Sequence, residues 1–222
     1  MKYPALLFLS MFLHLCSSAQ VKSFNIDSTK FNKSLVASLD TIYNDDQATR
    51  WKFVNAEHNK ASSTEIDSLK GVMIEKDKQN LVKVNYILSK YGWLGPQAVG
   101  INGSQALFLV IQHADLNTQK MYLPMIIKAE KDGEILSSNL AILEDRINVR
   151  EGKEQLYGSQ GFADKASGKN YVYPIVDPDH LDERRKSMGM PPMKEYKKDW
   201  DIVAYKSMLP EIQELAKQRY TN

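Results

Sequence analysis

The sequence predicts a mainly α-helical fold, a helical bundle or orthogonal array with a small β-hairpin near residues 155–175. Three observations carry this prediction. Apolar residues recur every three or four positions through most of the chain, which is the period of an amphipathic helix. Glycines follow several of these stretches, and glycine commonly ends a helix. Short segments rich in Tyr and Val occur only late in the chain, as expected for a hairpin.

The first helix is expected to start at Lys33 and to continue through Phe53, because one apolar stripe recurs along it: Leu35, Val36, Leu39, Ile42 and Tyr43. Ser62 and Glu65 have the spacing of a capping box, which predicts the next helix start. A further stripe from Leu81 to Tyr91 ends at Gly92, so we expect the helix to end there.

The segment Ser104–His113 is apolar on all sides at its centre, Ala106–Ile111, and we expect this to be the most buried part of the chain. A strand would fit so short a run as well, but the neighbouring helical segments favour a helix. Asp115 can cap a helix from Thr118 to Lys131, and Ser137 or Ser138 can open another that ends near Arg150.

Gln155–Gly161 and Asn170–Ile175 are the expected strands of the hairpin. Asp177 followed by Pro178 predicts a helix N-cap, with a helix to Gly189. Residues 190–193 are expected to be a loop, and Leu209–Tyr220 a terminal helix.

Residues 1–19 have the features of a signal peptide: a basic start, an apolar stretch and a small-residue cleavage site ending at Ala19. We expect export to the periplasm or beyond, a flexible tether at 20–31, and a single helical domain at 32–222. Cleavage after Ala19 removes Cys16, the only cysteine. Lipid attachment at Cys16 is the less favoured alternative, because Leu15 precedes it instead of a small residue.

The charge balance excludes a strongly basic nucleic-acid binder, since 29 Lys and Arg face 27 Asp and Glu. No apolar run after the leader is long enough to span a membrane. Standard motifs for phosphate loops, dinucleotides and zinc hydrolases are absent from the sequence, so no cofactor and no metal site is predicted. His113 and Asp115 could still supply two metal ligands, so metal dependence stays open. The expected partner is an unidentified small molecule or envelope component.

His113 is the main candidate for chemistry, because it stands in the polar segment Gln112-His113-Ala114-Asp115. A histidine with a carboxylate that orients it can act as a general acid or base. The alternative is a hydrogen-bonded histidine at a helix end, with Asp115 capping the next helix. Asp145 and Arg146 flank an apolar stripe of a helix that is apolar on two sides, so they are expected to be partly buried. They form either a buried ion pair or a polar pocket shared with His113.

Gln155, Tyr157 and Ser159 would share one face of a strand, with Gln160 on the other. An exposed hairpin and a ligand-binding edge both explain this pattern. We hypothesise one site in which His113, Asp115 and Asp145 are catalytic, while Gln112, Arg146, Gln155, Tyr157 and Gln160 bind the ligand. Asp46 and Arg50 are expected to form a helix-surface pair, and residues 182–186 a solvated helix face.

Several of these segments together resemble a bacterial family of unknown function that is frequent in exported proteins. They are Asp46-Gln47 with Arg50, Tyr91-Gly92-Trp93, Gln112-His113-Ala114-Asp115, Leu143-Glu144-Asp145-Arg146, Gln155-x-Tyr157-Gly158-Ser159-Gln160, Pro174 with Asp177, and Arg184-Arg185 with Gly189 and Pro191. The resemblance extends from about Leu35 to Tyr196, and Gly95-Pro96 departs from it. It groups these segments and implies no activity.

Three functions therefore stay open from the sequence. The polar residues around His113 could bind a ligand or partner, could form the active site of an envelope hydrolase with His113 as general acid or base, or could be internal packing. Where His113, Asp145 and Tyr157 lie relative to one another separates these functions most directly.

Overall fold

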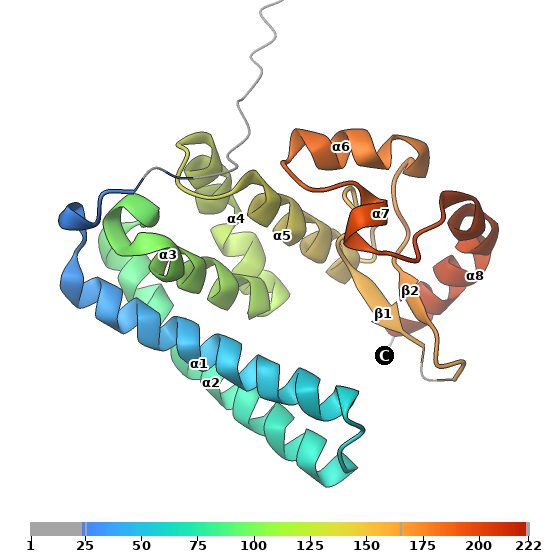
Figure 1. Cartoon of the computed structure of the whole chain (residues 1–222), viewed down its shortest axis with the longest axis horizontal. Coiled ribbons are helices and arrows are strands. Elements are labelled where there is room, and N and C mark those ends of the chain that lie inside the picture. The colour runs from blue at the N-terminus through green and yellow to red at the C-terminus, as the bar shows by residue number, and fades with distance from the viewer. Residues whose placement is uncertain (1–23, 25, 165, 221–222) are drawn as a thin grey trace, which may run out of the picture.

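The computed structural model describes residues 24, 26–164 and 166–220 and shows a mainly helical protein with one small antiparallel sheet (Figure 1). The fold class predicted from the sequence is therefore confirmed. The expected signal peptide at 1–19 lies outside the described residues. In the expected tether, Ser28–Lys30 form a 3₁₀ turn, and the chain then joins the helical core, where the Asn32 N–H donates to the Ala98 carbonyl at 3.0 Å.

Five long helices form the first part of the fold: α1 (Lys33–His58), α2 (Ser63–Tyr91), α3 (Pro96–His113), α4 (Leu116–Lys131) and α5 (Ser137–Arg150). In Figure 1, α1 and α2 lie side by side as a long hairpin. α1 and α3 run parallel, because Asn32 meets Ala98 near their starts and Asp46 meets His113 near the end of α3. This arrangement brings side chains of α1, α2 and α3 together beside His113.

A continuous hydrophobic core holds these five helices together. Its fully buried members include Leu39, Val84, Leu107, Ile126 and Leu143, one from each helix. The segment Ala106–Ile111 is helical, as predicted. All of its residues are buried except Leu109, which is half-buried. The helix begins earlier than expected, at Pro96, with a break at Gly100, whose φ of +74° is unfavourable for other residues.

The predicted helix starts at Ser62 and Asp115 are confirmed by their caps. Ser62 Oγ accepts from the Glu65 N–H at 3.2 Å, and Asp115 Oδ1 accepts from the Thr118 N–H at 2.9 Å. The stripes that follow Ser62 and Leu81 belong to one continuous helix, α2, because no glycine or proline with a breaking conformation separates them.

The second part of the fold contains the sheet and three short or terminal helices. It comprises β1 (Gly161–Ala163), β2 (Asn170–Val172), a 3₁₀ turn (Pro178–His180), α6 (Leu181–Ser187), α7 (Met193–Tyr196) and α8 (Ile202–Tyr220). β1 and β2 pair antiparallel, with Phe162 opposite Tyr171. Phe162, Ile175, Met193, Tyr205 and Ile212 are among the residues of a second hydrophobic cluster between these elements.

Four boundaries differ from the prediction. Residues 155–160 are not a strand. Gln155 forms only an isolated bridge with Ile175, and the N–H groups of residues 156, 157, 159 and 160 bind the Asp145 and Gln155 side chains instead of a neighbouring strand. Asp177 does not cap with its side chain, which contacts His180, and α6 starts only at Leu181. Met193 begins α7 and so is not in a loop. α8 starts at Ile202, because Asp201 caps the N–H groups of Val203 and Ala204.

Candidate functional site

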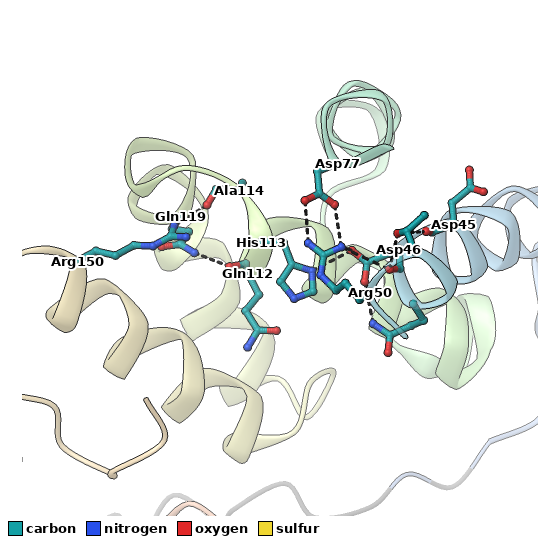
Figure 2. A network of polar contacts seen from close by, with 11 residues as sticks. Asp45, Asp46, Arg50, Asp77, Gln112, His113, Ala114, Gln119 and Arg150 are labelled. Carbon is teal, nitrogen blue, oxygen red and sulfur yellow. Dashed lines mark hydrogen bonds and ion pairs between the residues drawn. The ribbon is translucent and has the colours of Figure 1, made fainter. Parts of the chain in front are cut away.

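An aspartate–histidine pair lies where α1 and α3 meet. The His113 Nδ1 atom is 2.9 Å from Oδ1 of Asp46, a residue with no exposed surface (Figure 2). Because a carboxylate only accepts hydrogen bonds, the neutral imidazole carries its proton on Nδ1 and has a lone pair on Nε2. Asp46 therefore fixes both the orientation and the tautomer of His113, as expected for a proton-transfer pair.

A network of α1 and α2 side chains holds Asp46 in place. Arg50 Nη1 lies 3.1 Å from Asp46 Oδ1, and the same guanidinium binds both oxygens of Asp77 at 2.9 and 2.8 Å. Gln47 Nε2 donates to the other Asp46 oxygen at 2.8 Å. Burial raises the pKa of Asp46. The hydrogen bond with His113, the charge of this histidine when it is protonated and the charge of Arg50 lower the pKa and outweigh burial, so that the net change is downward. Asp46 is thus held as an anion.

Gln112 lies beside the histidine and has a side-chain amide without a hydrogen bond among the described residues. Only 8% of Gln112 is exposed, and its backbone carbonyl accepts from Gln119 Nε2 at 2.6 Å. In Figure 2 the Gln112 side chain and the free edge of the His113 ring extend to the same side, away from Asp77. The two side chains can therefore contact the same bound group.

Arg146 on α5 adds a positive charge to this region. Its Nε is buried and has no hydrogen-bond partner in the described part of the chain. Burial lowers the pKa of Arg146 to about 10, and the nearby charges of Arg150 and Arg50 lower it as well. Arg146 is still a cation at neutral pH, and no ion pair in the described ranges neutralises it.

Asp145, the residue before Arg146 on α5, binds the loop 155–160. Its two oxygens accept from the N–H groups of Leu156, Tyr157 and Ser159 at 2.7, 2.9 and 2.9 Å and from Ser159 Oγ at 2.8 Å. Burial raises the pKa of Asp145, opposed by these hydrogen bonds. Asp145 therefore organises the loop 155–160, and it does not form the ion pair with Arg146 considered from the sequence.

The residues of this loop have mainly internal contacts. Gln155 is fully buried, donates to the carbonyls of Gln160 and Tyr173 at 3.0 Å each, and accepts from the Gln160 N–H at 2.8 Å. Burial raises the pKa of the Tyr157 phenol, and the Glu144 carboxylate raises it further. Gln160 Nε2 donates to Ser159 Oγ at 3.0 Å.

The structure thus brings together only part of the predicted site. Gln112 and His113 are neighbours, and Arg146 interacts with Arg50 of the same network. Asp115 serves as the helix cap, and within the described part of the chain no hydrogen bond joins His113 to Asp145 or Tyr157. Sequence reasoning missed Asp46 as the carboxylate that orients His113. Only the family resemblance could have indicated this contact, because it groups Asp46-Gln47 and Arg50 with the segment Gln112-His113-Ala114-Asp115.

The fold and this network define a mainly helical protein with a buried aspartate–histidine pair and an uncompensated arginine. The chain belongs to a family of unknown function, DUF6624, which matches residues 33–206. No curated protein and no solved structure matches the chain. Among the described residues, no helix has both the length and the apolar character needed to cross a membrane, and no group of three or more His, Cys, Asp or Glu residues could hold a metal ion.

Proposed function

We propose that the region between α1, α3 and α5 binds a small anionic ligand through Arg146. The observation that carries this proposal is the buried Arg146 Nε without a partner, in a guanidinium whose nearest charged neighbours include two further arginines. An unpaired buried charge costs several kcal/mol. An anion that accepts from Arg146 offsets this cost. Arg150, which forms no ion pair among the described residues, favours the anion further. The charge of Arg50, by contrast, is already paired with Asp46 and Asp77.

Two further groups can contact the same ligand. The Gln112 amide supplies a donor and an acceptor, and His113 Nε2 is not hydrogen-bonded to any described residue. A guanidinium, an amide and an imidazole together suit the several oxygens of a carboxylate or phosphate. This set retains Gln112, His113 and Arg146 of the hypothesised site, whereas Asp145 and Gln155 hold the loop 155–160 in place.

The Asp46–His113 pair favours a second candidate function, proton transfer to or from the bound anion. A histidine oriented by a buried carboxylate is the arrangement used for general acid–base catalysis. Hydrolysis of an anionic envelope component is the reaction that fits this pair together with the signal-like leader. Export to the periplasm or outside the cell belongs to this proposal and is supported by the leader sequence alone.

Calorimetric titration tests the binding function directly. Phosphate, sulfate and acetate are titrated into the full chain, into R146M and into the matched control R219M. Arg219 is a suitable control because it is exposed and lies on α8, where it donates to the Ala163 carbonyl at 3.3 Å. At least one anion should bind to the wild-type chain and to R219M, and about tenfold more weakly to R146M. Equal binding by R146M would overturn the proposal.

The proton-transfer function has a separate test. The wild-type chain should hydrolyse at least one of p-nitrophenyl phosphate and mono-p-nitrophenyl succinate, and H113Q should lose this activity while it still binds the anion. D46N should reduce turnover, because the imidazole loses the partner that fixes its tautomer. If H113Q retains full activity, or if neither ester is hydrolysed, binding alone remains as the proposed function.

A further inference from the structure

A groove of about 430 Å³ lies beside α7 and β1. It is lined by Gly158–Ala163, Asn170–Val172, Met193, Tyr196 and Lys197. None of these lining residues is acidic, and the charge of Lys197 is paired with Asp199 at 2.7 Å. The groove therefore offers amide, hydroxyl, aromatic and main-chain groups to a ligand, without a strong charge of its own.

Main-chain atoms form part of this lining, because Gly158 and Gly161 have no side chains. Two hydrogen bonds at the ends of the hairpin show which residues of β1 bond to β2. The Tyr173 N–H donates to the Gln160 carbonyl, and the Asp164 N–H donates to the Lys169 carbonyl. By alternation, Gly161 is a non-hydrogen-bonded pair with Val172, so its N–H and C=O point to the open edge of β1. The carbonyl of Ala163, the next outward-facing residue of this edge, accepts from Arg219 Nη1 at 3.3 Å, so the free donor and acceptor that suit an extended peptide backbone are those of Gly161.

One end of the groove is near two guanidinium groups. The Tyr196 ring lies over Arg185, with 4.8 Å from the ring centroid to the guanidinium carbon, and its hydroxyl is 3.4 Å from the Ser159 carbonyl. The Tyr196 phenol is also close enough to Arg146 to interact with its charge. Arg185 is fully buried, and its Nη2, like the Nε of Arg146, has no hydrogen-bond partner in the described part of the chain.

We propose that this groove holds an extended peptide whose C-terminal carboxylate is the anion bound by Arg146. The inference rests on the proposed function and names the class of its ligand. Charge complementarity supports it, since a groove without acidic residues and with free main-chain groups ends near Arg146, which forms no ion pair in the described part of the chain. A glycan strand fits less well, because sugar rings stack on exposed aromatic faces. Phe162 and Tyr171 are buried here, and the half-exposed Tyr196 has one ring face covered by Arg185, which leaves a sugar a single free aromatic face.

The test uses amide resonances of the full chain in nuclear magnetic resonance spectra. Three probes are titrated: acetate, a pool of random hexapeptides with free C-terminal carboxylates, and the same pool with C-terminal amides. The carboxylate pool should shift the Gly161 and Ala163 amides and bind about tenfold more tightly than the amide pool. The inference is overturned if the β1 amides do not shift, or if the two pools shift them equally.

Two tryptophan variants locate the bound peptide. Ala163 lines the groove, whereas Ala166 is exposed in the turn outside it. A163W should therefore weaken peptide binding about tenfold by filling the groove, and A166W should leave it within about twofold. Equal affinities of A163W and A166W would contradict the proposed position. Tighter binding of chitotriose than of the peptide pool would identify a glycan site instead.

Acetate separates the two proposals. If acetate shifts the Gln112 and His113 amides in the wild-type chain but not in R146M, the anion site stands, and a failure of the peptide to bind refutes only the further inference. If acetate and phosphate bind no more weakly to R146M than to the wild-type chain, the proposed function itself fails.

Discussion

Replacing Arg146 by methionine should stabilise the ligand-free protein, the opposite of what most buried substitutions do. Burial and the neighbouring arginines lower the pKa of Arg146 to about 10, roughly 2.5 below its usual value. At 1.36 kcal/mol per pH unit this corresponds to about 3 kcal/mol of unfavourable free energy at neutral pH, where both the folded and the unfolded chain carry the charge. The partial exposure of Arg146 screens part of it, so we expect R146M to gain about 1–2 kcal/mol.

Urea denaturation, with linear extrapolation of the free energy of unfolding, measures this gain. Adding an anion should then reverse the order of stabilities. At a phosphate concentration of about 100 times the Kd, the wild-type chain gains about 2.7 kcal/mol, and R146M gains much less. R219M should respond to phosphate as the wild-type chain does. If R146M is instead destabilised by more than about 1 kcal/mol, Arg146 has a structural partner and the reasoning is wrong.

Three further predictions concern stability and its pH dependence. D145N should destabilise by about 2–4 kcal/mol in urea, because an amide nitrogen then faces N–H donors of the loop; a loss below about 1 kcal/mol would contradict this role. The folded-state pKa of Asp46 is below its unfolded value, so its stabilisation is present above about pH 4 and is lost as the pH falls through the folded value. The stability difference between wild type and D46N should therefore stay constant above about pH 4 and shrink as the pH falls below it, and a difference that stays constant at lower pH would refute this. L107A should cost about 2–5 kcal/mol, since Leu107 is fully buried, and calorimetric unfolding measures this loss.

The helices were largely predictable because their signals are local. Ser62 and Asp115 were identified as helix caps from residue type and spacing, and both caps form. The strands were less predictable. Tyr and Val enrichment indicated a hairpin near 155–175, but it could not show that Asp145, 10 residues before Gln155 in the sequence, takes the N–H groups of residues 156, 157 and 159. A side chain from another element decided this backbone conformation, and local patterns do not report such contacts.

The candidate site was predictable only in part, for a related reason. The sequence identified His113 and Gln112 as neighbours, and burial of Arg146 followed from the two-sided apolar pattern of its helix. For Asp115, two positions away, the sequence left two roles open, a carboxylate beside His113 or a helix cap, because residues two apart on a helix point in different directions; the cap is what forms. The actual partner, Asp46, is separated from His113 by 67 positions and reaches it because α1 and α3 run parallel. Helix packing determines that contact, and local sequence patterns do not show which helices pack side by side.

Asp145 and Arg146 show how one helix serves two purposes. Consecutive residues of a helix point about 100° apart, so Asp145 can bind the loop while Arg146 turns toward the region of α1 and α3. The carboxylate that would otherwise neutralise Arg146 is thereby fully engaged by four donor groups of residues 156–159. The loop held by Asp145 continues into Ser159 and Gln160, which line the groove beside Tyr196. Loosening this loop with D145N should therefore weaken peptide binding more than acetate binding, which titration of both ligands into D145N can measure under conditions where the variant is folded.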